Sequence, residues 1–164
     1  MQIDLVSQSQ YESLVDLMCE LNRYYNEDSF AARETIKSHL INNVLGSKSP
    51  LQIAVAYENE KVLGFAAISL IYSLVEPTPD KCRQCQLKEL YVLKSHRGRG
   101  IGKSVMSWVA RYAIDNGCHR IDWPVKATNL RGISFYKELG AQQVVERFSF
   151  RLSDSGLSKL AEKI

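Results

Sequence analysis

The sequence predicts an α/β fold of the α+β kind, with a mixed, mostly antiparallel central sheet flanked by helices. Two apolar runs, residues 51–57 and 62–74, are joined by a short polar turn and predict a β-hairpin. A third strand, residues 87–93, is rich in apolar and aromatic residues and breaks into a glycine-rich, cationic turn. Apolar residues then recur at helical spacing, so a helix is expected to begin at the glycines.

The residues before the hairpin predict one strand and two helices. Residues 2–6 alternate in polarity as a short strand does. Ser9 and Glu12 have the spacing of a capping box, which predicts a helix that extends to about Tyr25. A second helix is expected from about residue 31 to residue 45.

The residues after the glycine-rich turn are expected to complete the sheet. The helix that begins there is followed by a strand, residues 119–125, in which Pro124 cannot donate to a ladder. A further helix is expected from Asn129 to Gly140, and residues 142–152 are expected to close the sheet as a last strand. The chain then ends in a short helix.

Length and composition indicate one ordinary domain over residues 1–164. The sequence has neither an apolar run of about 18 residues nor a charged-then-apolar leader, so a cytoplasmic protein without a membrane partner is expected. The four cysteines are too scattered for a disulfide framework. Cys82 and Cys85 form a single C-x-x-C, and because no second pair completes a zinc site, no metal is expected.

The charge is distributed unevenly along the chain. The net charge is +3, but residues 1–60 carry nine acids and four bases, so residues 61–164 carry a net +8. This division suits a basic part that meets a polyanionic cofactor and an acidic part that meets a cationic amine, although ordinary surface charge explains the acidic part equally well. Nucleic acid is not an expected partner, because the bases are dispersed and are not interleaved with aromatic residues.

The glycine-rich turn predicts an anion-binding site. Glycines allow a ligand to approach the backbone, and a helix N-terminus presents N–H groups without intrahelical acceptors. Cationic side chains beside such N–H groups suit a phosphate or a pyrophosphate. The three cations and three glycines of the turn are Arg97, Arg99, Lys103, Gly98, Gly100 and Gly102.

Two familiar phosphate motifs do not fit this turn. A P-loop needs four residues between its first glycine and the Gly-Lys-Ser, whereas Gly98 and Gly102 are separated by three. The dinucleotide fingerprint needs G-x-G-x-x-G followed by a strand with an acidic end, and here Asp115 lies within the following helix. A glycine-rich turn with solvated cations is the structural alternative.

Two motifs resemble those of the GNAT N-acetyltransferase superfamily. Arg97, Gly100 and Gly102 match the family's acyl-CoA loop, which reads Arg or Gln, two variable residues, Gly, one variable residue, then Gly or Ala. Residues 129–141 resemble the family's N-x(6)-Y-x(3)-G-A/F segment at every marked position. The order of elements matches over nearly the whole chain, and the motifs are most similar to those of small-amine and diamine acetyltransferases.

The resemblance implies an acyl-CoA N-acyltransferase fold, in which the fourth and fifth strands splay apart around the pantetheine arm of acetyl-CoA. It implies that backbone groups near the end of the third apolar strand hold the acetyl and pantetheine portions, and that an N–H there polarises the thioester carbonyl. A homodimer is the assembly to test. The cofactor-binding residues that it indicates are Leu90, Tyr91, Val92, Arg97, Gly98, Arg99, Gly100, Ile101, Gly102, Lys103 and Asn129.

Two residues are indicated as catalytic. Tyr136 stands seven residues after Asn129, on the same helix face, and by resemblance it protonates the leaving sulfur, for which a phenol is a plausible donor. The structural alternative is a ring that packs on the sheet. Glu89 is a candidate to take the amine proton directly or through water, and a purely structural Glu89 is an equal alternative. In polyamine-type relatives an acid occupies the position of Lys88, so a polyamine acceptor is in doubt.

The leading hypothesis is an acyltransferase (EC 2.3.1 class) that moves the acetyl group of acetyl-CoA to a primary amine by direct attack in a ternary complex. The acceptor is left open between a small amine and a protein or peptide amine, because in the family that this chain resembles the first two helices and their loop set the acceptor, and these vary. The alternative is a non-catalytic CoA-binding or sensing module. Tyr136 argues against this alternative, because a pure binder needs no acid at that position.

Overall fold

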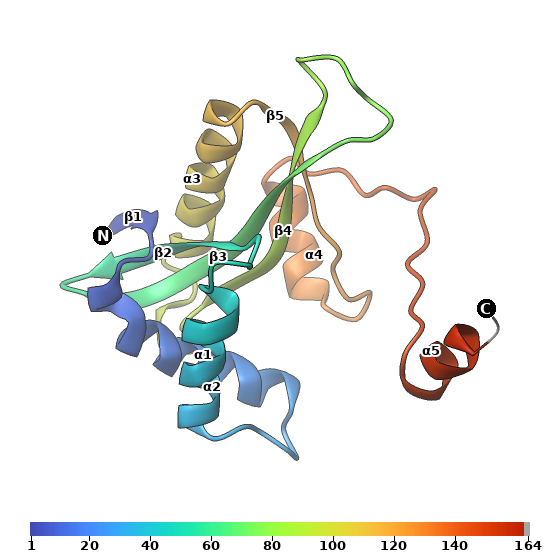
Figure 1. Cartoon of the computed structure of the whole chain (residues 1–164). Helices are drawn as coiled ribbons and strands as arrows, with labels where there is room; N and C mark the ends of the chain where they lie inside the picture. The colour runs from blue at the N-terminus through green and yellow to red at the C-terminus, as the bar shows by residue number, and fades with distance from the viewer. Residues whose placement is uncertain (163–164) are drawn as a thin grey trace. The chain divides into compact units, whose positions relative to one another are not determined.

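The computed structural model describes residues 1–162, which divide into two units, residues 1–124 and the residues that follow (Figure 1). The expectation of a single domain over residues 1–164 stays a prediction. The first unit contains β1 (Gln2–Leu5), α1 (Tyr11–Tyr25), α2 (Arg33–His39), β2 (Gln52–Glu58), β3 (Lys61–Tyr72), β4 (Arg83–Val92), α3 (Ile101–Asp115) and β5 (Cys118–Asp122). The second unit contains α4 (Leu130–Glu138) and α5 (Asp154–Ala161).

The sheet of the first unit has the strand order β1-β2-β3-β4-β5. Its pairs are antiparallel except for the parallel pair of β4 and β5, which confirms the mixed, mostly antiparallel sheet that the sequence predicts. The predicted hairpin joins β2 and β3 through Asn59 and Glu60, both with left-handed φ (48° and 64°), as type I′ turns require.

The pairing of β4 and β5 ends early. Its last register pair is Gln86 with Asp122, whereas β4 continues for six residues to Val92. Pro124 follows two residues after β5 and has no N–H to extend the ladder. In residues 1–162, therefore, the second half of β4 has no ladder partner on its β5 side, in agreement with the splayed strands of the acyltransferase fold.

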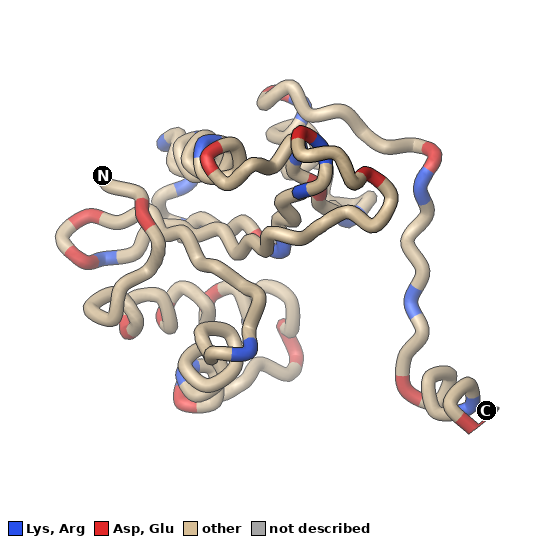
Figure 2. Tube along the Cα trace, turned by 45° about the horizontal axis from the view of Figure 1, so that its top comes forward, with Lys and Arg blue, Asp and Glu red and all other residues tan. Residues whose placement is uncertain are grey.

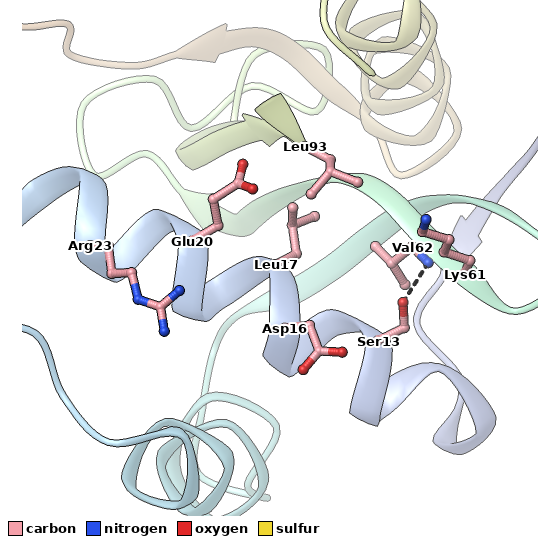
Figure 3. A pocket seen from close by; sticks show the side chains of 8 residues that line it. All are labelled: Ser13, Asp16, Leu17, Glu20, Arg23, Lys61, Val62 and Leu93. Atoms are coloured by element: carbon pink, nitrogen blue, oxygen red, sulfur yellow. Dashed lines mark hydrogen bonds between the residues drawn. The ribbon is translucent and has the colours of Figure 1, made fainter. Parts of the chain in front are cut away.

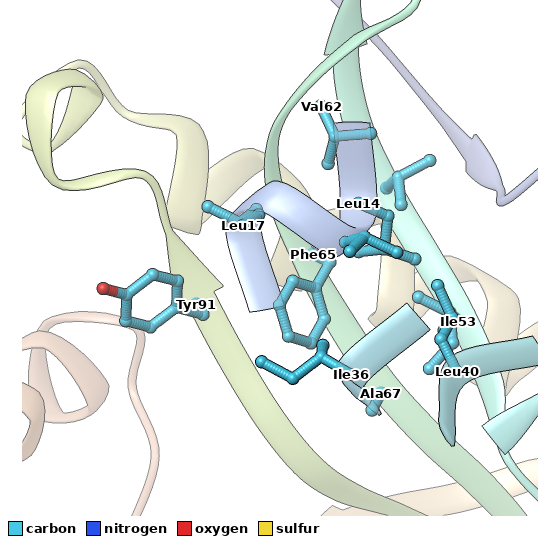
Figure 4. Close-up of a cluster of buried hydrophobic side chains, with 11 residues drawn as sticks. Leu14, Leu17, Ile36, Leu40, Ile53, Val62, Phe65, Ala67 and Tyr91 are labelled. Carbon is cyan, nitrogen blue, oxygen red and sulfur yellow. The ribbon is translucent and has the colours of Figure 1, made fainter. Parts of the chain in front are cut away.

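Helices cover both faces of this sheet (Figure 1). The face under α1 and α2 holds the main hydrophobic core, in which Leu14 and Leu17 of α1 pack with Phe65 of β3 and Tyr91 of β4 (Figure 4). The opposite face carries α3, whose residues Ile101, Val105, Met106, Val109 and Ala113 are buried. The 3.6-residue spacing of these apolar positions explains why α1 and α3 each present one stripe to the sheet.

Several acidic side chains in residues 1–60 form ion pairs within the protein. Arg33 of α2 donates to the carboxylates of Glu12 and Asp16 on α1, at 2.9 Å each, and Lys37 also pairs with Glu12. These two cations lower the pKa of Glu12, Lys37 having the larger effect. Figure 2 marks the charged positions along the trace. The acids of α1 that face α2 thus join the two helices.

Two sequence expectations about local structure are wrong. The helix start is not a capping box of Ser9 and Glu12, because a 3₁₀ turn, Gln8–Gln10, precedes α1 and the Ser9 hydroxyl donates to Glu60. Residues 142–152 do not form a strand: Phe148 and Phe150 are 82% and 93% exposed, and no described strand pairs with them. Alternation in polarity indicates a two-faced strand, but a strand also needs a neighbour with which to share backbone hydrogen bonds.

Gly64 on β3 sets how closely α3 approaches the sheet. A Cβ at this position would lie 3.1 Å from the Tyr91 carbonyl oxygen and 3.2 Å from Cγ2 of Ile101, the first residue of α3. Both distances are shorter than normal van der Waals contacts. The start of α3 therefore rests directly on the backbone of β3 and β4.

We predict that Gly64→Ala lowers the free energy of unfolding by about 1–3 kcal/mol, because the added methyl overpacks this contact. Urea unfolding measures the change, with the exposed Ser107→Ala on α3 as the control that leaves stability nearly unchanged. Strand propensity alone favours alanine over glycine. A more stable Gly64→Ala protein would therefore contradict the close approach.

Candidate functional site at the end of strand β4

In the second half of β4, the side chains and backbone groups of the odd-numbered residues face known neighbours, α1 and β3. The side chains of Glu89 and Tyr91 lie on the face that α1 covers, since Tyr91 packs in the core with Leu14 and Leu17. The Leu93 N–H donates to the carbonyl of Leu63 on β3, at 2.9 Å, so odd-numbered residues at this end of β4 turn their backbone groups towards β3.

By this alternation, the backbone groups of Leu90 and Val92 face the open side of β4. The Val92 carbonyl accepts a hydrogen bond from Arg97 Nε there, at 3.0 Å. Of the three strand residues indicated by resemblance, Leu90 and Val92 thus have backbone groups on the side without a ladder partner, and Tyr91 turns its backbone towards β3. Their contact with a cofactor stays a prediction.

Glu20 of α1 joins that helix to the chain where it leaves β4. Its Oε1 accepts hydrogen bonds from the Tyr91 hydroxyl at 3.0 Å and from the Lys94 N–H at 2.8 Å. Burial, and then the hydrogen bond and charge of Glu20, raise the pKa of Tyr91 to about 12. Lys94 begins a 3₁₀ turn, Lys94–His96, that leads into the glycine-rich stretch. One carboxylate oxygen therefore holds both the strand end and the start of the loop.

The Arg97 side chain folds back over the strand end. Its Cζ lies 4.9 Å from the centroid of the Tyr91 ring, which is a cation–π distance. Because Nε also donates to Val92, this side chain fixes the direction in which the chain leaves β4. A contact of the same guanidinium with a cofactor phosphate stays a prediction.

The glycine-rich turn leads directly into α3, as the sequence predicts. Gly98 and Gly100 have φ of +79° and +78°, a left-handed conformation that side chains other than glycine rarely adopt, and a Cβ at either would point into open space. The Ser104 N–H donates to the Gly100 carbonyl at 3.0 Å. The N–H groups of Ile101, Gly102 and Lys103 precede this bond and have no intrahelical acceptor. With Arg99 and Lys103 exposed beside them, they can receive an anion.

Sequence analysis missed the last turn of α1 as part of the site. Burial, and then the negative charge of Glu89, raise the pKa of the Tyr25 hydroxyl. The Tyr24 ring lies 5.1 Å from the Tyr25 ring, edge to face, and 6.4 Å from the Tyr91 ring. The sequence signal that could have indicated this turn was a pair of adjacent tyrosines at the end of an amphipathic helix. In the structure the two side chains are 55% and 46% exposed.

In the second unit, the marked residues of the second motif define the two ends of α4. Asn129 Oδ1 accepts from the Gly132 N–H at 2.9 Å, which caps the helix, and a Cβ on Gly132 would lie 2.6 Å from Asn129 Nδ2. At the other end, Gly140 has φ +86° and the Ala141 N–H donates to the Tyr136 carbonyl at 3.1 Å, as in a Schellman motif. The helix phase of Tyr136 is thus fixed, while its catalytic role and the cofactor contact of Asn129 stay predictions.

A small cavity of about 280 Å³ is lined in part by Glu20 (Figure 3). It is lined by α1, the start of β3 and the residue after β4: Ser13, Asp16, Leu17, Glu20, Arg23, Lys61, Val62 and Leu93. Acids and bases both line it, so it has no single preferred charge. Neither Tyr25 nor Glu89 lines this cavity.

The cysteines of the sheet are poorly suited to nucleophilic chemistry. Cys85 and Cys118 are buried, and burial raises the pKa of both thiols, that of Cys85 to about 12. Across residues 1–162, no three His, Cys, Asp or Glu side chains gather closely enough to hold a metal ion. In the same residues, no helix combines the length and the apolar character needed to cross a membrane.

The mixed sheet that opens beside β4, followed by a glycine turn that starts α3, defines an acyl-CoA N-acyltransferase fold. The family model described as Acetyltransferase (GNAT) family matches residues 14–141. The chain therefore belongs to this family of acyltransferases, which confirms the family and fold class that the sequence predicts.

Similar proteins agree with this membership. A bovine thialysine N-epsilon-acetyltransferase is 36% identical over 86 residues, 51% of each chain, and the L-ornithine N5-acetyltransferase NATA1 of Arabidopsis thaliana is 30% identical over 74 residues, 45% of this chain and 32% of the relative. The chain spans about half the length of the first curated relatives that it matches. A solved structure of the V. cholerae integron cassette protein VCH_CASS6 has a TM-score of 0.89 at 34% identity, covering 99% of this chain and 98% of that one.

We predict that Glu20→Ala lowers the free energy of unfolding by about 1–3 kcal/mol, because it leaves the buried Tyr91 hydroxyl without its acceptor. Glu20→Gln, which keeps an oxygen at Oε1, is the matched control and retains most of the stability. Urea unfolding of Glu20→Ala in a Tyr91→Phe background measures the coupling, and the loss should be smaller there. Equal losses in both backgrounds would show that the two side chains do not interact.

The raised pKa of Tyr91 gives the same contact a pH signature. A phenol whose pKa rises on folding, from 10 to about 12, contributes stability that is fully present below pH 10 and is lost as pH rises through 12. Between pH 10 and pH 12 the free energy of unfolding of the wild type, measured with urea, should therefore fall by more than that of Tyr91→Phe.

Proposed function

We propose that the protein is an N-acetyltransferase that moves the acetyl group of acetyl-CoA to a primary amine of a small molecule, by direct attack in a ternary complex. The observation that carries the proposal is the open side of β4, where the backbone groups of Leu90 and Val92 lead directly into the glycine turn of α3. The names of the relatives support a small-molecule acceptor, since both specify a side-chain amine of an amino acid. A protein or peptide amine is the wider class.

The cofactor is proposed to bind along this path. The N–H groups of Ile101, Gly102 and Lys103 receive the diphosphate, with Arg99 supplying further positive charge. The extended arm adds beside β4 in place of a ladder strand, so that its amides pair with Leu90 and Val92. An N–H at this point polarises the thioester carbonyl. A CoA complex of the aminoglycoside N-acetyltransferase AAC(6′)-Iy, with a TM-score of 0.68 at 20% identity over 93% of this chain and 99% of that one, has the same fold.

The chemistry needs a base and an acid. The amine nitrogen forms a bond to the thioester carbon, the C–S bond breaks, and the sulfur leaves with its electron pair. We assign the amine proton to Glu89, directly or through water, and we assign protonation of the departing thiolate to Tyr136 of the second unit. Direct attack also agrees with the raised pKa of Cys85 and Cys118, because neither buried thiol is a ready acyl acceptor.

The proposal extends to a cytoplasmic protein that acts as a homodimer and binds neither nucleic acid nor a membrane. The charge pattern supports this choice of ligands, because residues 61–164 carry a net charge of +8, which suits a polyanionic cofactor. The acids of α1 that pair with Arg33 and Lys37 contribute less to a cationic acceptor, because those cations already neutralise them.

The test is a screen of amines with purified protein and acetyl-CoA, read as CoA thiol release and as the mass of the acetylated product. We predict turnover with a side-chain amine such as that of L-ornithine or thialysine. Gly102→Val should raise the Kd for acetyl-CoA by roughly 10²-fold, because its side chain blocks approach to the backbone. Ser107→Val, an equally β-branched change further along α3, should leave binding unchanged.

Each outcome of the screen has a distinct meaning. Binding of acetyl-CoA without thiol release for any amine would indicate the CoA-binding or sensing module instead of an enzyme. Normal binding by Gly102→Val would show that the glycine turn does not hold the cofactor.

We also predict that Tyr136→Phe lowers kcat by roughly 10²-fold or more, with little change in the Kd for acetyl-CoA, because it removes the acid and keeps the ring. Phe135 is adjacent in the same helix, with its ring 5.2 Å from that of Tyr136, and Phe135→Tyr is a matched control for a changed hydroxyl in this turn. Unchanged kcat in Tyr136→Phe would mean that the tyrosine only packs.

A further inference from the structure

The end of β5 is tied to the connection between β3 and β4, residues 73–82. This connection projects from the sheet beside β5 (Figure 1). Arg120 of β5 donates through Nη1 to Glu76 Oε2 in the connection, at 2.9 Å, and through Nε to Asp122 Oδ2, at 2.8 Å. One guanidinium therefore joins Asp122, the last residue of β5, to a segment that precedes β4.

His119 supports the same guanidinium from the side of β4. Its Nδ1 lies 2.9 Å from the carbonyl oxygen of Arg83, the first residue of β4. A carbonyl oxygen can only accept, so Nδ1 is the donor, and in the neutral ring Nε2 is then an acceptor. This Nε2 lies 3.2 Å from Arg120 Nη1. Arg120 is thus placed by contacts with two carboxylates and one ring nitrogen.

Glu76 is a fixed anchor although it lies in a connection. Its N–H donates to Ser73 Oγ at 3.0 Å, and the Ser73 N–H donates to the Cys82 carbonyl at 2.7 Å, which closes the base of the connection. The side chains of Glu76 and Arg120 are 35% and 33% exposed, so water and salt screen their ion pair less than a fully exposed one. The carboxylate that Arg120 contacts is therefore held through its own backbone.

These contacts lie where the gap beside β4 opens. Gln86 with Asp122 is the last register pair of β4 and β5. Under the proposed function, a pantetheine arm that pairs with Leu90 and Val92 lies between β4 and the departing end of β5. Backbone hydrogen bonds need donor–acceptor distances of about 2.7–3.2 Å, so an arm that is displaced sideways loses them. The direction in which β5 ends therefore affects how the arm is held.

We propose that Arg120 is a positioning residue for acetyl-CoA: its bridge from Asp122 to Glu76 holds the β5 side of the gap that takes the pantetheine arm. Glu20 holds the β4 side of the same gap through Tyr91. The inference rests on the proposed function, because the width of the gap matters only to a ligand that lies in it. Sequence analysis gave no role to Arg120 or Glu76, which are 44 positions apart.

The experiment compares the Kd of acetyl-CoA with the Kd of ADP, which carries a diphosphate without the pantetheine arm, by calorimetry. In Arg120→Ala, the Kd of acetyl-CoA should rise roughly five- to tenfold, because the gap is no longer pre-organised, and the Kd of ADP at the glycine turn should not change. Arg111→Ala removes an equal charge from an exposed position on α3 and should leave the ratio of the two Kd values unchanged.

Glu76→Ala breaks the bridge at its other end. Because Glu76 lies in a connection and is partly exposed, this variant tests the inference even where Arg120→Ala unfolds. It should also raise the Kd of acetyl-CoA and leave that of ADP unchanged. In the Glu76→Ala background, Arg120→Ala should add less than it does alone. Fully additive effects would overturn the bridge, because they would show that the two side chains act separately.

Urea unfolding of each variant measures the effect on the fold separately from the two Kd values. Lower stability with an unchanged Kd ratio would show that Arg120 supports only the fold, and an equal rise in both Kd values would indicate a general loss of positive charge. Either result would overturn the inference.

Failure of the proposed function has a different signature. Wild-type protein that binds no acetyl-CoA would refute the proposed function and this inference with it. A selective rise in the Kd of acetyl-CoA in Arg120→Ala, with no acetylation of any amine, would refute the proposed enzyme and leave the positioning role of Arg120 in place.

Discussion

The Glu20 carboxylate is the interaction on which the rest of the site depends. One oxygen accepts from the Tyr91 hydroxyl and from the Lys94 N–H, so a single side chain of α1 fixes both the end of β4 and the first residue of the turn beyond it. Tyr91 in turn supplies the ring on which Arg97 lies. If this carboxylate moved, the strand end, the arginine and the approach to the glycine turn would all lose a support.

The second constraint is the early end of the β4–β5 ladder. Beyond the last pair, Gln86 with Asp122, the backbone groups on this side of β4 lie outside the ladder, and apart from the Val92 carbonyl, which accepts from Arg97, another molecule can supply their partners. An extended amide-containing ligand can satisfy them as a strand would. The same edge continues into N–H groups at the start of α3, which suit a phosphate. The proposed path of acetyl-CoA along β4 would therefore also account for the early end of the ladder.

Local patterns in the sequence predicted the parts of this structure that neighbouring residues decide. The glycine turn, the period of α3 and the turn of the β2–β3 hairpin depend on residues within a few positions of one another, and each was predicted. The hydrogen bond between Glu20 and Tyr91 joins residues 71 positions apart, and no local pattern reports such a pair. For the same reason the approach of Tyr24 on α1 to Tyr91 on β4 was missed. The alternation of residues 142–152 was read as a strand because it specifies two faces, but the pattern does not say which strand would pair with it.

The central claim is that acetyl-CoA and the amine are held together beside β4 and react directly. Initial rates measured while the concentrations of acetyl-CoA and of one accepted amine are both varied test it most directly. A ternary complex predicts double-reciprocal lines that intersect, because each substrate must be present for the other to react. Parallel lines, the kinetic signature of a covalent acetyl-enzyme, would contradict the claim.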